Sequence, residues 1–401
     1  MELFRGVDVD WLGKKWYFLA FSLVFSVSGV LSILFWHGIK LGIDFRGGTL
    51  VYVQFEQAPN LDRIREAMDR AGIHDSRIQA YGTADQKQVA ISLAQKETQE
   101  SSLDAGRETI LKTLNANYSS TGAANPGKLD LDNASQGSLA QYLEQNDPEH
   151  LLSTGSAGQK YAQQAAAILN HRDKDLGGIF SSLDQLNGVA DPAVVNQLKQ
   201  GAYLSGFHVF AADIIGPQVG AALRRQALLA TLYSLAGMLV YLWFRFELIY
   251  GVAAVVAVFH DTLITVGAFS LRDQEMTLTV IAALLTLIGY SMNDTIVVFD
   301  RIRENLRMSR RENLASVVNR SINQTLSRTV LTSGLTFLTV LSLYVFGGEV
   351  LRGFSFALVI GILIGTYSSI AVAAPMLVAY QEWRAKRGKQ AVLPTGKKAK
   401  V

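Results

Sequence analysis

Long apolar runs separated by short polar connections are the dominant pattern along the chain. A helix rises about 1.5 Å per residue, so about 20 mostly apolar residues are needed to cross roughly 30 Å of hydrocarbon. The first suitable run is too long for the apolar part of a signal peptide, and we expect a retained anchor. Six runs are long enough to be membrane-spanning helices: residues 16–36, 226–244, 248–271, 276–299, 329–346 and 354–380.

Between the first and second runs the pattern changes to short alternating stretches and amphipathic segments, which are typical of a folded domain outside the membrane. We expect two helices at residues 61–72 and 102–117, and strands at residues 49–55, 76–82, 88–94 and 206–217. The order strand-helix-strand-strand-helix-strand is that of a ferredoxin-like split unit. We therefore predict a polytopic α-helical membrane protein with six transmembrane helices and an α+β ferredoxin-like domain.

An insertion at about residues 118–203 separates the second predicted helix of this domain from its last strand. It begins with SSTGAANPG, whose Ser, Asn, Gly and Pro residues favour loops. Four segments with helical spacing follow: QGSLAQYLEQN, QKYAQQAAAILNH, GIFSSLDQLNG and PAVVNQLKQ. We interpret the insertion as a helical appendage with mobile joints, and the sequence indicates no role for it.

Lysine and arginine residues gather on one side of the predicted spans. They cluster before the first run, between the fourth and fifth runs, and after the sixth run, whereas the short connections on the other side contain only Arg272 and Arg352. Cytoplasmic connections are enriched in Lys and Arg, so we predict that both termini are cytoplasmic. This orientation makes residues 1–15, 300–328 and 381–401 cytoplasmic and residues 37–225 exported, in a multi-pass membrane protein.

Composition agrees with a membrane protein that has a large water-exposed part. The 401 residues are 49% hydrophobic and 18% charged, with a mean hydropathy of +0.20. The absence of cysteine excludes disulfides, cysteine-ligated zinc and thiol catalysis. Neither a Walker nucleotide motif nor a HExxH or GxSxG motif occurs, so we expect no enzyme and no cofactor. The sequence pI of about 8.9 reflects cytoplasmic basic residues that contact anionic lipid, and we expect no nucleic-acid partner.

The stretch GYSMNDTIVVFD places Asn293 and Asp294 inside the fourth apolar run. An ionisable side chain inside a membrane helix is costly and usually marks an ion pathway or pairs with another charge. A helix that begins near Met276 carries Asp294 about 27 Å along its axis, toward the cytoplasmic end. The alternative is a solvated residue at the lipid–water boundary, but the largely apolar residues 295–299 separate Asp294 from Asp300. We therefore favour Asp294 as a proton-carrying group.

The stretch NQTLSRTVLTSG places Arg328 at the cytoplasmic start of the fifth span, at a depth similar to that of Asp294. A nearby guanidinium favours an ionised carboxyl and burial favours a neutral one, so a carboxyl between both effects can bind and release a proton. Arg328 is the expected partner of Asp294; the alternative is a boundary residue that extends its charge to the interface. Asn293 either lines the same pathway or hydrogen-bonds between helices.

Two further features of the spans contain candidate residues. His260 and Asp261 lie near the middle of the third span, where they form either part of a proton relay or a satisfied structural bridge. In the sixth span, Gly361 and Gly365 have the four-residue spacing of a helix-packing seam.

Several extended motifs occur in a characteristic order along the chain. They are LGIDFRGGTL after the first span, IGPQVG before the second, FHD in the third, GYSMNDTIVVFDRIREN in the fourth, NQTLSRT in the fifth and VIGILIGTYSSI in the sixth. This set resembles the SecF branch of the SecD/SecF family, which belongs to the RND-type superfamily. The resemblance covers nearly the whole chain except the insertion at about 118–203.

The resemblance implies an RND-like half that forms a complex with SecD and assists the SecYEG channel, with YajC as a further candidate partner. Its cargo would be unfolded preprotein, moved outward with the proton-motive force. The family's fourth-span Asp and fifth-span Arg are implicated in proton flow, and they match Asp294 and Arg328. Two alternatives stay open: a self-contained RND-like proton-driven exporter of a small molecule or lipid, and a passive assembly scaffold.

Overall fold

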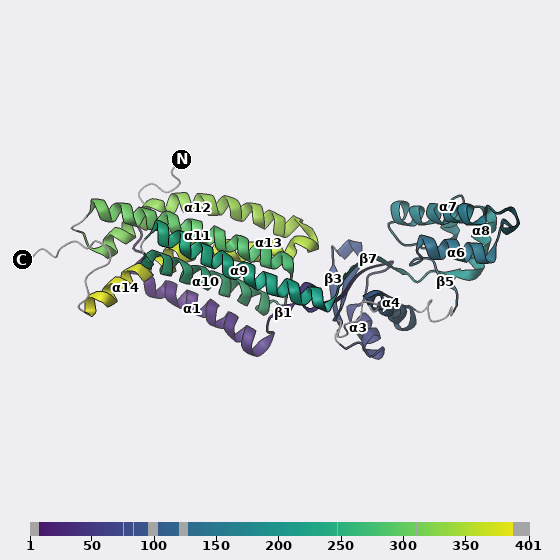
Figure 1. Cartoon of the computed structure of the whole chain (residues 1–401), viewed down its shortest axis with the longest axis horizontal. Coiled ribbons are helices and arrows are strands. Elements are labelled where there is room, and N and C mark those ends of the chain that lie inside the picture. The colour runs from purple at the N-terminus through teal and green to yellow at the C-terminus, as the bar shows by residue number, and fades with distance from the viewer. Residues whose placement is uncertain are drawn as a thin grey trace, which may run out of the picture. The chain divides into compact units, whose positions relative to one another are not determined.

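The computed structural model describes residues 8–74, 76–82, 84–94, 103–119, 127–246, 248–309 and 312–387. The chain divides into two compact units (Figure 1). We call them the membrane unit, which runs to Gly42 and resumes at Ala222, and the sheet unit, Ile43–Ala221.

The membrane unit contains six helices that are long and apolar enough to cross a membrane, which confirms the predicted number of spans. Short π-helical turns extend the first and last of them. In chain order the elements are α1 (Lys15–Leu31), η1 (Ser32–Trp36), α9 (Pro217–Arg245), α10 (Leu248–Leu271), α11 (Leu278–Met308), α12 (Leu314–Phe346), α13 (Gly348–Ser368), η8 (Ser369–Ala373) and α14 (Ala374–Lys386). A two-residue parallel pair, β1 (Lys40–Leu41) and β8 (Glu275–Met276), joins two connections of this unit.

Three helices extend well beyond the apolar runs that predict them. α9 begins at Pro217, α11 continues to Met308, and α12 begins at Leu314. Most of the predicted loop 300–328 is therefore helical. The Asn313 side chain caps the start of α12 by accepting from the Ala315 N–H at 3.4 Å. Hydropathy indicates only where a helix leaves hydrocarbon and not where its hydrogen bonds end.

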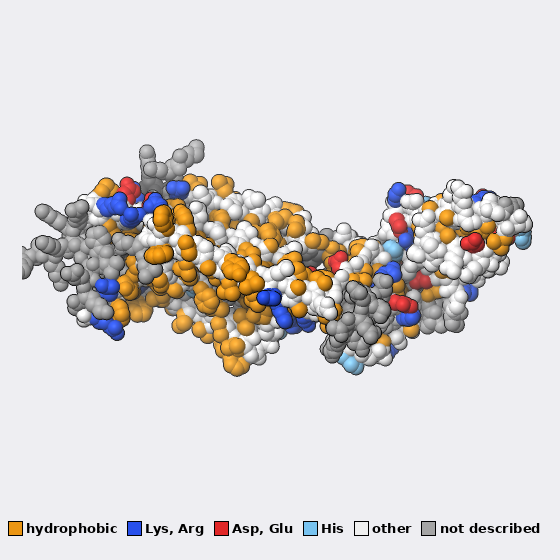
Figure 2. All heavy atoms as spheres, viewed as in Figure 1, with side chains coloured by type: hydrophobic (Ala, Val, Ile, Leu, Met, Phe, Trp, Pro, Cys, Tyr) orange, Lys and Arg blue, Asp and Glu red, His pale blue; other side chains and the backbone are white. Residues whose placement is uncertain are grey.

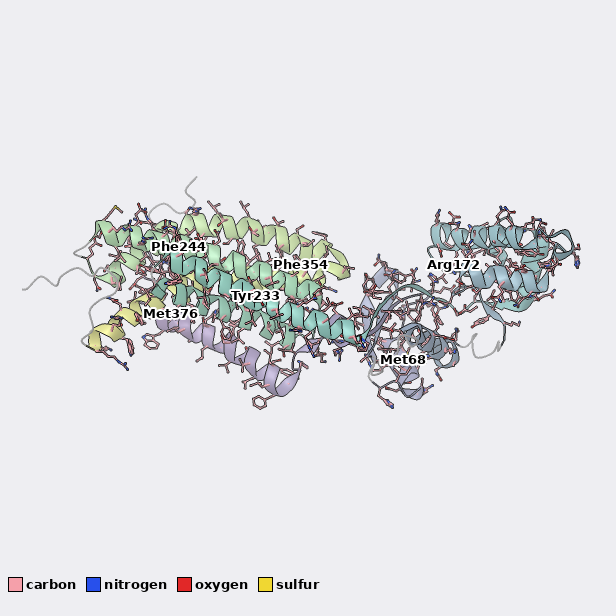
Figure 3. The ribbon with its side chains drawn as sticks, viewed as in Figure 1. Met68, Arg172, Tyr233, Phe244, Phe354 and Met376 are labelled. Atoms are coloured by element: carbon pink, nitrogen blue, oxygen red, sulfur yellow. The ribbon has the colours of Figure 1, made fainter. Side chains whose placement is uncertain are left out.

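α13 and α11 occupy the middle of the membrane unit. They pack against each other and both pack against α10 and α12, while α1 packs on α10. Figure 2 shows hydrophobic side chains spread over the visible face of these helices, as expected for surfaces in contact with lipid. α9 is the most exposed span; Tyr233 and Phe244 lie on its outer side (Figure 3).

The sheet unit has the ferredoxin-like topology that the sequence predicts. Its sheet has the order β3-β4-β2-β7, with every neighbouring pair antiparallel. Val51, Val53 and Phe55 alternate inward along one strand and contribute to a core against the helices. The elements are α2 (Ile43–Arg46), β2 (Gly48–Phe55), α3 (Leu61–Arg70), β3 (Ser76–Tyr81), η2 (Ala84–Gln86), β4 (Gln88–Ala94), α4 (Leu103–Thr113), η4 (Leu114–Tyr118) and β7 (Phe207–Ile215).

The predicted insertion folds into its own small helical core. Segment 178–188 forms only a short 3₁₀ turn rather than a helix, and the SSTGAANPG loop lies outside the described residues at 120–126. Asn133 ties the insertion to the sheet, donating to the Phe207 carbonyl and accepting from the Val209 N–H, both at 2.9 Å. The elements are β5 (Leu129–Asp130), α6 (Gln136–Asn146), η5 (Leu152–Thr154), α7 (Ala157–Asn170), η6 (His171–Asp175), η7 (Leu183–Leu186), α8 (Pro192–Gly201) and β6 (Ala202–Tyr203).

Two consecutive glycines allow the two ends of the sheet unit to cross. Gly47 and Gly48 have φ angles of +75° and +146°, which favour glycine. A Cβ atom on Gly47 would lie 2.6 Å from the Cα atom of Pro217, and one on Gly220 would lie 2.8 Å from the Gly47 nitrogen. The backbones of the first and last segments therefore touch at this point.

Candidate functional site

Asp294 is buried in the centre of the membrane unit. α11 carries it, and only 2% of the residue is exposed. Ser333 of α12 donates its hydroxyl to Asp294 Oδ2 at 2.6 Å. The Thr366 hydroxyl of α13 faces the same carboxyl group. Asp294 is therefore not a solvated residue at a helix end, and its contacts join three helices.

Arg328 lies near this carboxyl without pairing with it directly. Its guanidinium acts on Asp294 through space, but none of the ion pairs within 4.0 Å in the described part of the chain joins them. Arg328 is exposed and lies five positions before Ser333 on α12. The attraction between Arg328 and Asp294 thus acts over a longer distance than a direct ion pair, and α12 carries both the guanidinium and the hydroxyl donor.

A second carboxyl, that of Asp261 on α10, is also buried, with 1% of the residue exposed. Its Oδ2 atom accepts hydroxyl bonds from Ser291 of α11 at 2.6 Å and Ser368 of α13 at 2.7 Å. Its Oδ1 atom lies 2.9 Å from Nδ1 of His260. The buried Nε2 atom of His260 has no hydrogen-bond partner, so this ring has an unused site for a proton or a donor.

Two glycines of α13 bring these hydroxyls close to the acids. A Cβ atom on Gly361 would lie 2.4 Å from Cδ1 of Leu287, and one on Gly365 would lie 3.0 Å from Cβ of Ser291. No larger side chain fits at Gly361 without displacing Leu287, so α11 and α13 can approach closely only with glycine there. Ser368 follows directly on this close contact.

The structure does not bring every predicted pathway residue into this cluster. Asn293 is exposed although Asp294 beside it is buried, because adjacent residues of a helix point in directions about 100° apart. Sequence patterns did not identify Ser291, Thr366 or Ser368 as partners of the acids, since isolated hydroxyl residues are common in membrane helices. The one available signal was the three-residue spacing of Ser291 and Asp294, which places them on one helix face.

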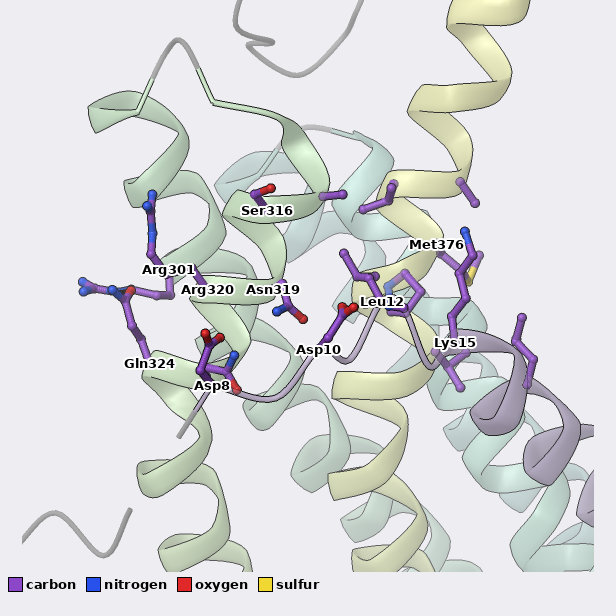
Figure 4. Close-up of a pocket in the computed structure, with 18 of the residues that line it drawn as sticks. Asp8, Asp10, Leu12, Lys15, Arg301, Ser316, Asn319, Arg320, Gln324 and Met376 are labelled. Carbon is purple, nitrogen blue, oxygen red and sulfur yellow. Dashed lines mark hydrogen bonds between the residues drawn. The ribbon is translucent and has the colours of Figure 1, made fainter. Parts of the chain in front are cut away.

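A groove of about 1800 Å³ opens beside Arg328 at one end of the membrane unit. The N-terminal segment, α12 and the last helix line it, as Figure 4 shows for Asp10, Leu12, Asn319 and Met376. Within the described residues, no group of three or more His, Cys, Asp or Glu side chains is arranged to hold a metal ion.

The fold and the buried acids define a class: a polytopic helical membrane protein built like half of an RND-type assembly. Residues 196–383 match the profile described as protein export membrane protein SecD/SecF, C-terminal, and residues 33–59 match the SecD/SecF GG motif. The chain is 63% identical to the protein translocase subunit SecF of Koribacter versatilis, over 98% of this chain and 96% of that one. It is 35% identical to the Calditerrivibrio nitroreducens subunit, over 94% and 96%. The chain belongs to the SecF group of the SecD/SecF family of protein translocase subunits.

Solved structures agree with this assignment. The chain is similar to the crystal structure of SecDF, a translocon-associated membrane protein from Thermus thermophilus, with a TM-score of 0.64 and 29% identity over 94% of this chain. It spans only 39% of that longer SecDF chain. A second structure, SecDF in a super-membrane-facing form, gives a TM-score of 0.55 over 96% of this chain. The protein is accordingly a translocase subunit of the inner membrane.

Proposed function

We propose that this chain works with SecD and uses the proton-motive force to assist outward movement of unfolded preproteins through SecYEG. The observation that carries the proposal is the buried carboxyl of Asp294, bonded to Ser333 and close to the Arg328 charge. Both termini are cytoplasmic and the sheet unit is exported, because the basic connections gather on one side. YajC is a further candidate partner; no nucleic acid, cofactor or enzymatic activity enters the proposal.

The physical basis is a two-state helix contact. A protonated carboxyl loses most of its attraction to a guanidinium, so proton binding at Asp294 weakens the interaction that Arg328 exerts on α11. One charge crossing 100 mV supplies about 2.3 kcal/mol, which is enough to change the populations of states that differ by a few kcal/mol. The resulting shift of α12 against α11 would move the exported domain.

A SecD-type half fits the exposed polar side of the unit. Arg328, Asn293 and Thr332 are exposed on the apolar helices α11 and α12, where contact with lipid tails would be costly. Packing of another six-span half against this side would remove these groups from lipid. It would also complete the pathway that this chain contains only in part.

His260 and Asp261 are included in the proposed pathway as a second proton-holding pair. The support is the unpartnered Nε2 atom of His260 beside a fully buried carboxylate. Asp261→Asn retains an oxygen that accepts from Ser291 or Ser368 but cannot ionise. We expect reduced proton flux with normal assembly; unchanged flux would assign the pair to structural bridging.

The main test is Asp294→Asn in proteoliposomes that contain SecYEG, SecD and this chain. We expect loss of the proton-dependent part of preprotein translocation, with the complex assembled at its normal level. Asp300→Asn is the matched control, because Asp300 lies on the same helix but is exposed. Its ion-pair partner is Arg245 at the end of α9, at 3.8 Å, so we expect this variant to behave as wild type.

Each outcome of this test decides between functions. Full stimulation by Asp294→Asn together with unchanged proton flux would support a passive scaffold and overturn the proposal. Copurification as a self-assembled oligomer without SecD or SecYEG would support a self-contained exporter instead.

A further inference from the structure

Two asparagines of α12 hold the N-terminal strap, which we define as residues 8–13. Asn319 donates to the Val9 carbonyl at 3.0 Å and accepts from the Trp11 N–H at 2.8 Å. Asn323 donates to the same carbonyl at 3.0 Å and accepts from the Val9 N–H at 3.3 Å. It also accepts from the Trp11 indole N–H at 2.9 Å. The two amides therefore bind donors and acceptors of the strap from positions one helical turn apart.

The other side of the strap is anchored to the bundle and to α1. Leu12 is buried in the largest hydrophobic cluster of the membrane unit, and Trp11 packs against that cluster. The Trp11 ring stacks on Phe18 of α1 with 5.7 Å between centroids. Asp10 accepts from the Gly13 N–H at 2.8 Å and so closes the turn that leads into α1. Figure 4 shows the strap crossing from α12 toward the helix of Met376.

The strap connects two helices whose main packing partners differ. α1 packs chiefly on α10, and α12 packs chiefly on α11 and α13. Along α12, Asn323 precedes Arg328 by five positions, about 7.5 Å along the helix axis, so the strap binds close to the site. α1 continues through η1 and residues 37–42 into the sheet unit, whose first residue is Ile43.

We propose that Asn319 and Asn323 are positioning residues that transmit movement of α12 to α1, and through α1 to the exported domain. Neither amide titrates or touches Asp294, so their role is mechanical rather than in proton transfer. This inference rests on the proposed function, because it assigns the physical link between the proton site and the moving domain. It also gives the strap a function beyond anchoring the chain.

The test separates coupling from proton transfer. In the same proteoliposomes, Asn319→Ala with Asn323→Ala should keep proton flux near the wild-type rate. Proton-dependent translocation should fall about fivefold or more, the lower end of typical coupling between sites. Asn305→Ala is the matched control: it removes 2.8 Å bonds to Ser321 and Gln324 of α12 without touching the strap, and it should remain coupled.

A reversible rescue distinguishes a mechanical link from general destabilisation. The chain has no cysteine, so Val9→Cys with Asn323→Cys introduces one defined pair. We expect this variant to be uncoupled when reduced and to regain stimulation when the pair is oxidised.

Three results would contradict the proposed connection between α12 and α1 or the function on which it rests. Normal stimulation of the double alanine variant would disprove the link. So would a loss of proton flux in parallel with stimulation in that variant, together with failure of oxidation to restore stimulation in the Val9→Cys, Asn323→Cys variant. Absence of proton-dependent stimulation in the wild type would instead remove the proposed function itself.

Discussion

The membrane unit and the sheet unit each bury aspartates, but the two sets bind different partners. Asp261 and Asp294 accept bonds from serine hydroxyls on neighbouring helices. Asp132, fully buried in the sheet unit, accepts from the backbone N–H groups of Phe180 and Gly206, both at 3.0 Å. Asp261 and Asp294 thus join helices through side chains that can rotate. Asp132 instead holds loops in place through their backbone N–H groups.

The type of partner determines whether the hydrogen bonds around an acid can rearrange when the acid gains or loses a proton. A hydroxyl both donates and accepts, so a serine can rotate and bond to a carboxyl that has gained a proton. A backbone N–H only donates, so it cannot turn to accept from a carboxyl that has gained a proton, and it holds the acid in one geometry. The comparison indicates that the acids of the membrane unit are suited to switching and that Asp132 is suited to holding the insertion on the sheet.

The largest effect that sharpens this contrast is expected from Asp132→Ala. The change leaves two buried N–H groups without an acceptor, at about 1–3 kcal/mol each, so we expect a loss of about 2–6 kcal/mol. Hydrogen exchange and denaturant-dependent proteolysis of residues 127–206 in the full chain measure it. Asp294→Asn retains an oxygen for Ser333 and should change stability by less than about 1 kcal/mol. Equal destabilisation by both variants would contradict the proposed difference between acids bound by backbone N–H groups and acids bound by hydroxyls.

A smaller effect is expected from Gly361→Ala, which tests the close packing that supplies hydroxyls to the acids. The added methyl group collides with Leu287, and overpacking costs about 1–3 kcal/mol. Gly289→Ala is the matched control in α11, where a Cβ atom meets nothing within 4 Å, so it should be neutral or stabilising by up to about 1 kcal/mol. Thermal inactivation of the purified complex should rank the variants in this order; equal behaviour would contradict the packing account.

In the wild-type protein the smallest effect concerns pH at the joint between insertion and sheet, because two titrations there oppose each other. Burial raises the pKa of Asp132 to about 7, and burial lowers the pKa of His208 to about 4. The Asp132 contribution is full below its unfolded pKa of 3.8 and is lost as pH rises through 7. The His208 contribution is full above its unfolded pKa of 6.5 and is lost as pH falls toward 4. Because His208 bonds the Asp132 carbonyl at 2.6 Å, both slopes act at one joint and oppose each other between pH 4 and 6.5.

Single substitutions should therefore reveal the opposing slopes. His208→Gln should make stability of the joint fall with rising pH, and Asp132→Asn should make it rise, each by at most about 1.4 kcal/mol per pH unit. Hydrogen exchange of residues 127–206 across pH 4 to 7.5 measures both. Flat profiles in the two variants would exclude titration at this joint.

Sequence patterns predicted the spans and the ferredoxin-like strand order because both depend on local periodicity. They also singled out Asp294, since a carboxyl in an apolar run is costly wherever its helix lies. They did not indicate that Asn293, next to Asp294 in the chain, is exposed on α11 while Asp294 is buried. They also placed the start of α12 too late, because a helix continues through polar residues once its hydrogen bonds and cap are in place.

What the sequence determined by itself was the number of spans, the order of the sheet elements and the presence of acids at membrane depth, because each follows from spacing along one segment. Only the tertiary structure decided which hydroxyls reach those acids, that Arg328 acts on Asp294 from a distance, and that Asn319 and Asn323 bind the strap. Those contacts join residues that are far apart in the chain, and their geometry depends on how closely neighbouring helices pack.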